Sequence, residues 1–483
     1  MKKVSILVVF LLMLLLTCVE DSGDFRIFYA ADFSGASQTF YKIDARLLAE
    51  NDICYVWAEK KSGVTEATAQ KVADSYKNDV YNKMLNAFGY KIKFKDKNGK
   101  DFELNNVQYV NWIAKGDNYD GKLTILLLDI KDNYRNGYND SFIAGYFWAG
   151  DLLNYRNSNK CDILYVDTKP GIPGSINSNE TLSHEMQHLM NFAGAVRRGK
   201  PTELWIDEGL SVTAEKVYLE GHSLQRLYSY NHDVSGLLGL GNNFYVWGNR
   251  EGEGKSKYAV LDDYSTVYLF FQWLGLHSDM DIYRKISASD SNDYNAVINA
   301  FNDTVSGTQY ADWESLLKDW LAANYFRNSV GRYGYADDTM LNDIKIRYAP
   351  DGPAVIDLFP GEGVYSGVIE LTSIPSPSGN INYAGLTGSS LVSSGTISSG
   401  ALLTFNANTN NNDDKSRAES GIITGKVPSA PPMADITQGS RGSGTAIGPF
   451  PISGSDKLRQ NGFNFDGMDF KIPDAYRGII VYE

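Results

Sequence analysis

Before residue 350, the hydrophobic pattern changes from strand-like to helical. Short apolar runs typical of strands lie at residues 25–30 and 53–58, and again at 123–129, 143–148 and 162–167. Residues 65–88 carry apolar side chains at the spacing of one helix face, and the pattern from 177 to about 328 is mainly helical. A sheet region followed by a helical region predicts an α+β fold.

The composition changes near residue 350. Residues 351–483 contain 19 of the 45 Gly and 10 of the 14 Pro, but no Trp and no His. Short β-rich runs alternate there with turn clusters, which predicts an all-β, sandwich-like domain. We therefore expect one sheet-plus-helix unit over residues 18–345 and a Gly/Pro-rich all-β accessory domain over residues 346–483.

The first seventeen residues have the pattern of an export signal. Lys2 and Lys3 precede an apolar stretch over residues 4–16, which is too short to span a bilayer comfortably. Cys18 follows directly and resembles the lipidated Cys of the bacterial lipobox, although Thr17 departs from the usual small residue. We expect a lipoprotein of the bacterial cell envelope, attached to the membrane through a lipid on Cys18, or a secreted protein if Cys18 is not lipidated.

The formal net charge is -13, and Lys and Arg are scattered along the chain. This distribution excludes the phosphate-neutralising surface that nucleic-acid binding needs. Cys54 and Cys161 both adjoin strand-like runs. They could form a disulfide in an oxidising compartment, or remain two buried thiols.

The motif with the clearest chemistry is His184-Glu185-Met186-Gln187-His188, in a chain that has only five His. On a helix, positions i and i+4 lie on one face, so both imidazoles can bind one ion while Glu185 lies beside it. Asn177 and Glu180 have the spacing of a capping box that would begin this helix, and Gly194 could end it. The structural alternative is a core helix with two hydrogen-bonded His.

A catalytic metal site needs a third protein ligand and an open position. The other His have no obvious ligand spacing, so a carboxylate is the better candidate. Residues 204–220 predict a second helix that ends at Gly221, and Glu208 lies in its first part. Folding back of this helix would offer Glu208 to the same ion.

H-E-x-x-H followed by W-x-[DN]-E-G resembles the gluzincin metallopeptidases, and the exported bacterial hyicolysin family looks most similar. The features that suggest hyicolysin are residues 184–191 and the upstream run 123–146. The resemblance covers about residues 25–330 and implies a gluzincin-like catalytic unit, with a mixed sheet lobe followed by a helical lobe. It also implies that His184, His188 and Glu208 bind zinc and that Glu185 is the catalytic base.

The same resemblance implies two supporting residues. Glu215, seven positions after Glu208, matches an acid that supports a zinc-bound His, although a solvated helix acid is the alternative and Asp207 competes for either role. Tyr264 matches the Tyr that stabilises the oxyanion, with Tyr258 and Tyr268 as alternatives that could equally be packing residues. The chain lacks the G-x-M-E-N motif that grips a free amino terminus, which favours an endopeptidase.

The sequence therefore predicts a zinc endopeptidase that hydrolyses peptide bonds of extracytoplasmic proteins with water activated by Glu185. The main alternative is a non-catalytic surface lipoprotein or adhesin with a structural or vestigial zinc site, and a glycoside hydrolase is a weaker one. The acidic turn at residues 117–122 could bind calcium, but a plain turn before a strand is the simpler interpretation.

Overall fold

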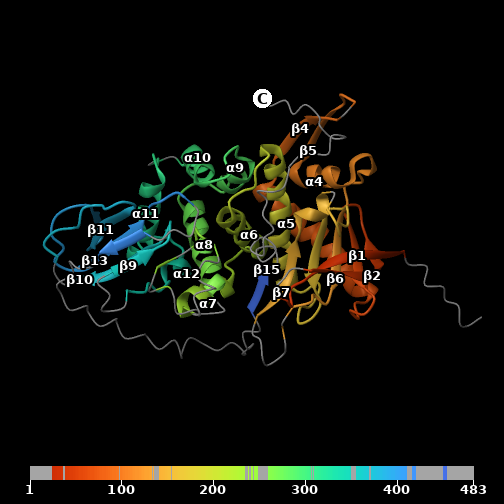
Figure 1. Ribbon diagram of the computed structural model, residues 1–483, viewed down its shortest axis with the longest axis horizontal. Coiled ribbons are helices and arrows are strands. Elements are labelled where there is room, and N and C mark those ends of the chain that lie inside the picture. Colours follow the sequence, from red (N-terminus) through yellow and green to blue (C-terminus); the bar gives the residue numbers. More distant parts are fainter. Residues whose placement is uncertain are drawn as a thin grey trace, which may run out of the picture.

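A seven-stranded mixed sheet forms one side of the molecule, and helices pack beside it (Figure 1). The computed structural model describes residues 24–453 except 36–38, 97, 133, 135–140, 154, 234–237, 239–240, 243, 248–258, 306, 308, 350–354, 369–370, 411–415 and 420–449. The first predicted element, the export signal with Cys18, lies outside the described residues.

The sheet has the order β1-β2-β3-β6-β8-β7-β15. β3, β6 and β8 run parallel to one another, whereas β1, β2 and β7 each run antiparallel to a neighbour. β6 and β8 are buried along their whole length, because their apolar runs lie in the middle of the sheet. The strands are β1 (Phe25–Asp32), β2 (Thr39–Glu50), β3 (Cys54–Glu59), β6 (Leu123–Leu128), β7 (Ser141–Phe147), β8 (Ile163–Asp167) and β15 (Phe450–Ser453).

The long helix predicted over residues 65–88 forms, with one wider turn in its middle. α2 (Glu66–Ser75) is capped by the Thr65 side chain, a π-helical turn spans Tyr76–Val80, and α3 (Tyr81–Phe88) continues in the same direction. The hairpin of β4 (Lys91–Lys95) and β5 (Asp101–Asn105) follows, and then α4 (Asn106–Lys115), none of which the pattern indicated.

The helix that carries the H-E-x-x-H motif is longer than predicted. α5 spans Ile176–Arg198, begins at the cap residue Ser175 and ends at Gly199 with φ 68°. The predicted Asn177 cap and the predicted stop at Gly194 were therefore wrong. Gly194 lies inside the helix. A β-carbon there would come within 2.9 Å of the Ser287 carbonyl oxygen, so close packing between two elements explains why this position is a glycine.

Among the described residues, seven further α-helices follow α5. They are α6 (Leu204–Leu219), α7 (Leu224–His232), α8 (Ala259–Leu276), α9 (Ile282–Ala288), α10 (Tyr294–Thr304), α11 (Trp313–Phe326) and α12 (Thr339–Asn342). The succession of a sheet lobe and a helical lobe agrees with the predicted α+β class. Within the described part of the chain, no helix combines the length and the apolar character that a membrane crossing requires.

The described residues after 350 form strands. β10 (Gly363–Val368), β13 (Gly400–Asn406), β11 (Ile381–Thr387) and β12 (Ser390–Val392) make a four-stranded antiparallel sheet, and β9 (Val355–Leu358) pairs with β14 (Ser416–Glu419). The Tyr365 hydroxyl donates to the Leu321 carbonyl on α11 over 2.7 Å, so this sheet packs on the helical lobe. β15 instead joins the first sheet, and the domain boundary at 345/346 stays a prediction.

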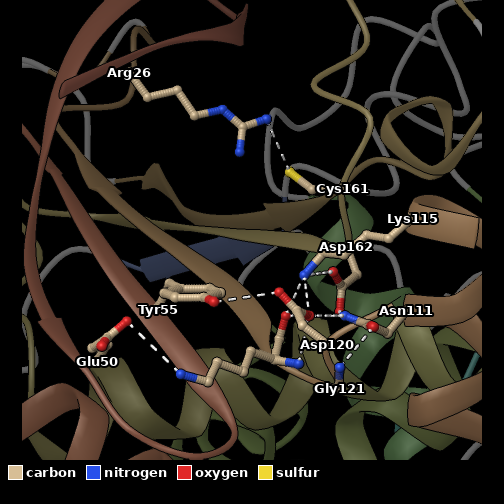
Figure 2. A network of polar contacts seen from close by, with 10 residues as sticks. Arg26, Glu50, Tyr55, Asn111, Lys115, Asp120, Gly121, Cys161 and Asp162 are labelled. Atoms are coloured by element: carbon tan, nitrogen blue, oxygen red, sulfur yellow. Dashed lines mark hydrogen bonds and ion pairs between the residues drawn. The ribbon is translucent and has the colours of Figure 1, made fainter. Parts of the chain in front are cut away.

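The acidic turn at 117–122 is held by a lysine of the protein itself (Figure 2). Lys115 Nζ lies 2.7 Å from Asp120 Oδ1 and 3.3 Å from Asp162 Oδ1, and Asn111 donates to Asp162 over 2.8 Å. Burial raises the pKa of Asp162 to about 6, although Lys115 opposes that rise. The ammonium group therefore already supplies the cation that this turn needs, in agreement with a plain structural turn.

Cys54 and Cys161 are buried free thiols in the structure. Burial raises the pKa of each thiol to about 12, so both stay protonated at neutral pH. Of the two alternatives for these cysteines, a disulfide or two buried thiols, the structure has the two thiols.

Candidate metal centre

Three side chains from α5 and α6 meet in the interior of the molecule. His184 and His188 project from α5 and Glu208 from α6, and one ligand atom of each lies within 4.8 Å of the others. Glu208 Oε2 is 3.4 Å from His184 Nε2 and 3.6 Å from His188 Nε2. The structure thus brings together the three residues that the sequence singled out as ligands.

The opposite ring nitrogen of each histidine is held by a carboxylate. His184 Nδ1 lies 2.8 Å from Glu215 Oε1, and His188 Nδ1 lies 3.0 Å from Asp207 Oδ2 and 3.1 Å from Ser211 Oγ. A neutral imidazole that donates its Nδ1 proton to such an acceptor keeps a lone pair on Nε2. Both lone pairs then belong to the nitrogen atoms nearest Glu208.

The chemistry of these atoms fits a metal ion. Within the described residues, His184 Nε2, His188 Nε2 and both carboxylate oxygens of Glu208 are buried and make no hydrogen bond. Buried polar groups are normally hydrogen-bonded, and one common reason for an exception is that the group binds an ion. Two imidazole nitrogens and a carboxylate are also a ligand set of catalytic zinc sites.

The charges around the three ligands favour a cation. Burial alone would lower the pKa of His184, but Glu208 and Glu215 overcome that effect and raise it to about 10. The pKa of His188 is also raised, because Asp207 and Glu208 outweigh its burial. The carboxylates therefore stabilise positive charge around the two histidines.

Arg226 on α7 anchors the carboxylate behind His184. Its guanidinium donates to both oxygens of Glu215, through Nε over 3.0 Å and Nη2 over 2.5 Å. Burial opposes ionisation of Glu215, yet Arg226 and His184 lower its pKa to about 2. Glu215 is thus a fixed anion, and sequence analysis missed Arg226 because eleven residues and a change of helix separate the pair.

Local structure explains why α6 presents acids to α5. Asp207 lies in the first turn of α6, and Glu208 follows it directly, where the positive end of the helix dipole stabilises carboxylates. Asn191 of α5 donates to Asp207 Oδ1 over 2.5 Å. Gly209 permits close packing beside these acids, because a β-carbon there would lie 2.2 Å from the Phe271 ring of α8.

Glu185 lies on the side of α5 that packs against β7 of the sheet. It is fully buried, and a β-carbon built on Gly145 of β7 would lie 3.4 Å from its Cγ. The absence of a side chain at Gly145 therefore gives Glu185 its room. Glu185 also neighbours His184 in sequence and adds to the negative charge that this histidine experiences.

Tyr264 on α8 lies near the same histidine. Its ring centroid is 6.1 Å from that of His184, and the Arg226 guanidinium lies 4.5 Å above the Tyr264 ring. Tyr268 points elsewhere, because its hydroxyl lies 2.8 Å from His222 Nδ1 and 3.3 Å from the Ser223 amide. Tyr258, the third candidate, lies outside the described residues.

The fold and the site define an α+β protein with a buried His-His-Glu group. No protein-family model matches the chain. Over an alignment of 237 residues, the chain is 30% identical to the neutral metalloprotease ShpI of Staphylococcus hyicus. The match covers 47% of this chain and 51% of ShpI. The chain therefore spans about half the length of this curated relative, and the similarity supports a metalloprotease family.

Proposed function

We propose that this protein is a zinc-dependent endopeptidase of the gluzincin type. The observation that carries the proposal is the convergence of His184, His188 and Glu208, whose facing atoms are buried without hydrogen bonds among the described residues. The similarity to ShpI, named a neutral metalloprotease, supports the reaction class. The aligned residues cover half of that relative, so the activity of the whole chain remains part of the proposal.

The three ligand residues would hold the zinc ion, and Asp207 and Glu215 would orient its two histidines. When bound, zinc acts as a Lewis acid toward water and the scissile carbonyl. Carboxylates behind metal-bound histidines fix the ring orientation and the tautomer. Arg226 keeps Glu215 charged, so the Nδ1 proton of His184 has a permanent acceptor.

Glu185 and Tyr264 would handle protons and charge at the peptide bond. Glu185 takes a proton from the attacking water and passes it to the leaving amine nitrogen, which cannot depart as an anion. Tyr264 donates a hydrogen bond to the carbonyl oxygen as negative charge develops there. Arg226 over the Tyr264 ring favours a fixed ring position, because a cation is attracted to an aromatic face.

Substrates would be proteins or peptides outside the cytoplasm. The chain lacks the motif that recognises a free amino terminus, so internal bonds are the expected targets. The apolar run at residues 4–16 and Cys18 support export and attachment to the membrane through a lipid.

A surface adhesin with a structural zinc site is not favoured. A structural site is closed by four protein ligands, whereas the group identified among the described residues has three, with the carboxyl-bearing Glu185 beside it. The similarity to a metalloprotease also points away from a binding module.

The proposal is tested by incubating a denatured proteome with the purified protein, with and without a chelator, and sequencing the new peptide termini. We expect new internal peptide termini that disappear with the chelator and return with added zinc. Zinc-loaded protein that produces no new termini would contradict it.

A further inference from the structure

The outer edge of β7 is occupied by a strand from the far end of the chain. β15 pairs in parallel with β7, and Phe450, Ile452 and Ser453 stand opposite Ser141, Ile143 and Gly145. About 300 residues separate the two strands in sequence, yet β15 lies directly beside β7 in the fold (Figure 1). The pairing is short and contains Pro451, which has no amide hydrogen and is tolerated in sheets on edge strands, at strand starts or at bulges.

This edge borders the candidate metal centre. β7 packs on α5, and a β-carbon added to Gly145 would lie 2.8 Å from Thr181 Cγ2 and 3.4 Å from Glu185 Cγ. Ser453 of β15 therefore stands opposite Gly145, the residue of β7 that faces the proposed catalytic base. The last residue of β15 reaches the part of the sheet that lies next to Glu185.

A strand has two edges, and β7 has a neighbouring strand at each of them. β8 pairs with one edge through Gly145, Tyr146 and Phe147, and β15 pairs with the other. An extended peptide that adds to an exposed edge gains main-chain hydrogen bonds. Such a peptide can pair with residues 141–145 of β7 only after β15 leaves.

We propose that residues 450–453 occupy the peptide-docking edge of β7 and thereby restrain the peptidase until an extended substrate displaces them. This inference rests on the proposed function. The competitor is covalently linked to the enzyme, so it acts at a high effective concentration whatever the protein concentration. Its four-residue length and its proline keep the pairing weak enough for exchange with a substrate.

The test compares three full-length, zinc-loaded proteins: wild type, Ile452→Pro and the matched control Lys457→Pro. Ile452→Pro removes the amide hydrogen of the residue opposite Ile143, whereas Lys457 follows the last residue of β15 by four positions in the sequence. Hydrogen exchange at residues 141–147 reports the pairing without reference to activity. Cleavage of a quenched fluorescent peptide gives kcat/KM, and zinc content and melting temperature show that the folded metal site persists.

We expect faster exchange in β7 of Ile452→Pro and an increase of about tenfold in kcat/KM, as if the competent fraction rose from roughly a tenth to nearly all molecules. Lys457→Pro should resemble wild type. A synthetic peptide of residues 447–456 should inhibit Ile452→Pro competitively and slow its β7 exchange again.

Two results are contrary and distinguishable. Equal kcat/KM in wild type and Ile452→Pro, with β7 exchange increased and both proteins active, would overturn this inference and leave the proposed function intact. Zinc-loaded proteins that cleave no peptide in either form would overturn the proposed function, and this inference with it.

Discussion

Glu215 Oε1 lies 2.8 Å from His184 Nδ1, while Arg226 holds both oxygens of the same carboxylate. The relationship links three helices, because His184 is on α5, Glu215 on α6 and Arg226 on α7. The hydrogen bond to Nδ1 therefore fixes the ring orientation of His184 and leaves Nε2 on the opposite side of the ring.

The carboxylates behind the histidines should control metal affinity. Glu215→Gln and Asp207→Asn each should weaken zinc binding by about 10- to 100-fold, because the histidine loses its fixed orientation and basicity. Competition with a chromogenic chelator measures the affinity. Glu220→Gln, at the exposed end of α6, is the control and should bind zinc like wild type. Unchanged affinity in both buried variants would show that the two carboxylates do not act through the metal.

Tyr264 and Tyr268 should behave differently when each loses its hydroxyl. Tyr264→Phe should lower kcat by about 100-fold, or roughly 3 kcal/mol, with little change in KM or zinc content, by analogy with removal of one oxyanion donor. Tyr268→Phe should mainly lower the melting temperature, because its hydroxyl contacts His222 and the Ser223 amide. Normal kcat in Tyr264→Phe together with a kcat loss in Tyr258→Phe or Tyr268→Phe would assign the role to another tyrosine.

Asp151 should make stability depend on pH. It accepts hydrogen bonds from the Asn159 amide and the Tyr165 hydroxyl, and burial raises its pKa to about 7 from 3.8. A raised folded-state pKa gives stability that is complete below pH 3.8 and is lost as pH rises through about 7. Urea unfolding between pH 4 and 8 should therefore show a smaller loss for Asp151→Asn than for wild type.

A shift of about three pKa units corresponds to up to about 4 kcal/mol of difference between the two curves across this range. Groups that titrate equally in both proteins cancel in that difference. Parallel stability curves for wild type and Asp151→Asn would mean that Asp151 does not ionise in this window.

Cys18→Ser should change how the protein partitions. A diacylglycerol-type lipid on Cys18 would be the only strong membrane contact that we expect, so the variant should move from the detergent phase to the aqueous phase. Phase separation followed by immunoblotting measures the shift. The same partitioning for both forms would argue for ordinary cleavage and a secreted product.

Much of the local structure could be predicted from periodicity, because α2, α3 and α6 each repeat apolar residues at helical spacing. The ends of α5 could not be predicted in the same way. Ser175 competes with other capping residues nearby, and Gly194 owes its presence to a contact with Ser287, which lies far away in sequence.

The same limit applies to the site. His184, His188 and Glu208 carry a spacing that indicates a metal, whereas Arg226 and Gly145 owe their positions to tertiary packing. The pairing of β15 with β7 also could not be predicted from the sequence, because a four-residue strand has no distinctive pattern and its partner strand lies far away in the chain.

The most direct test of the central claim measures zinc content and peptidase activity of Glu185→Gln and Glu208→Gln beside wild type. Glu208→Gln should lose zinc, because a ligand is weakened, and activity should fall with the metal. Glu185→Gln should keep its full zinc content and lose peptidase activity, because the base is gone while the ligands remain. A zinc-loaded Glu185→Gln protein that cleaves casein as fast as wild type would contradict the account.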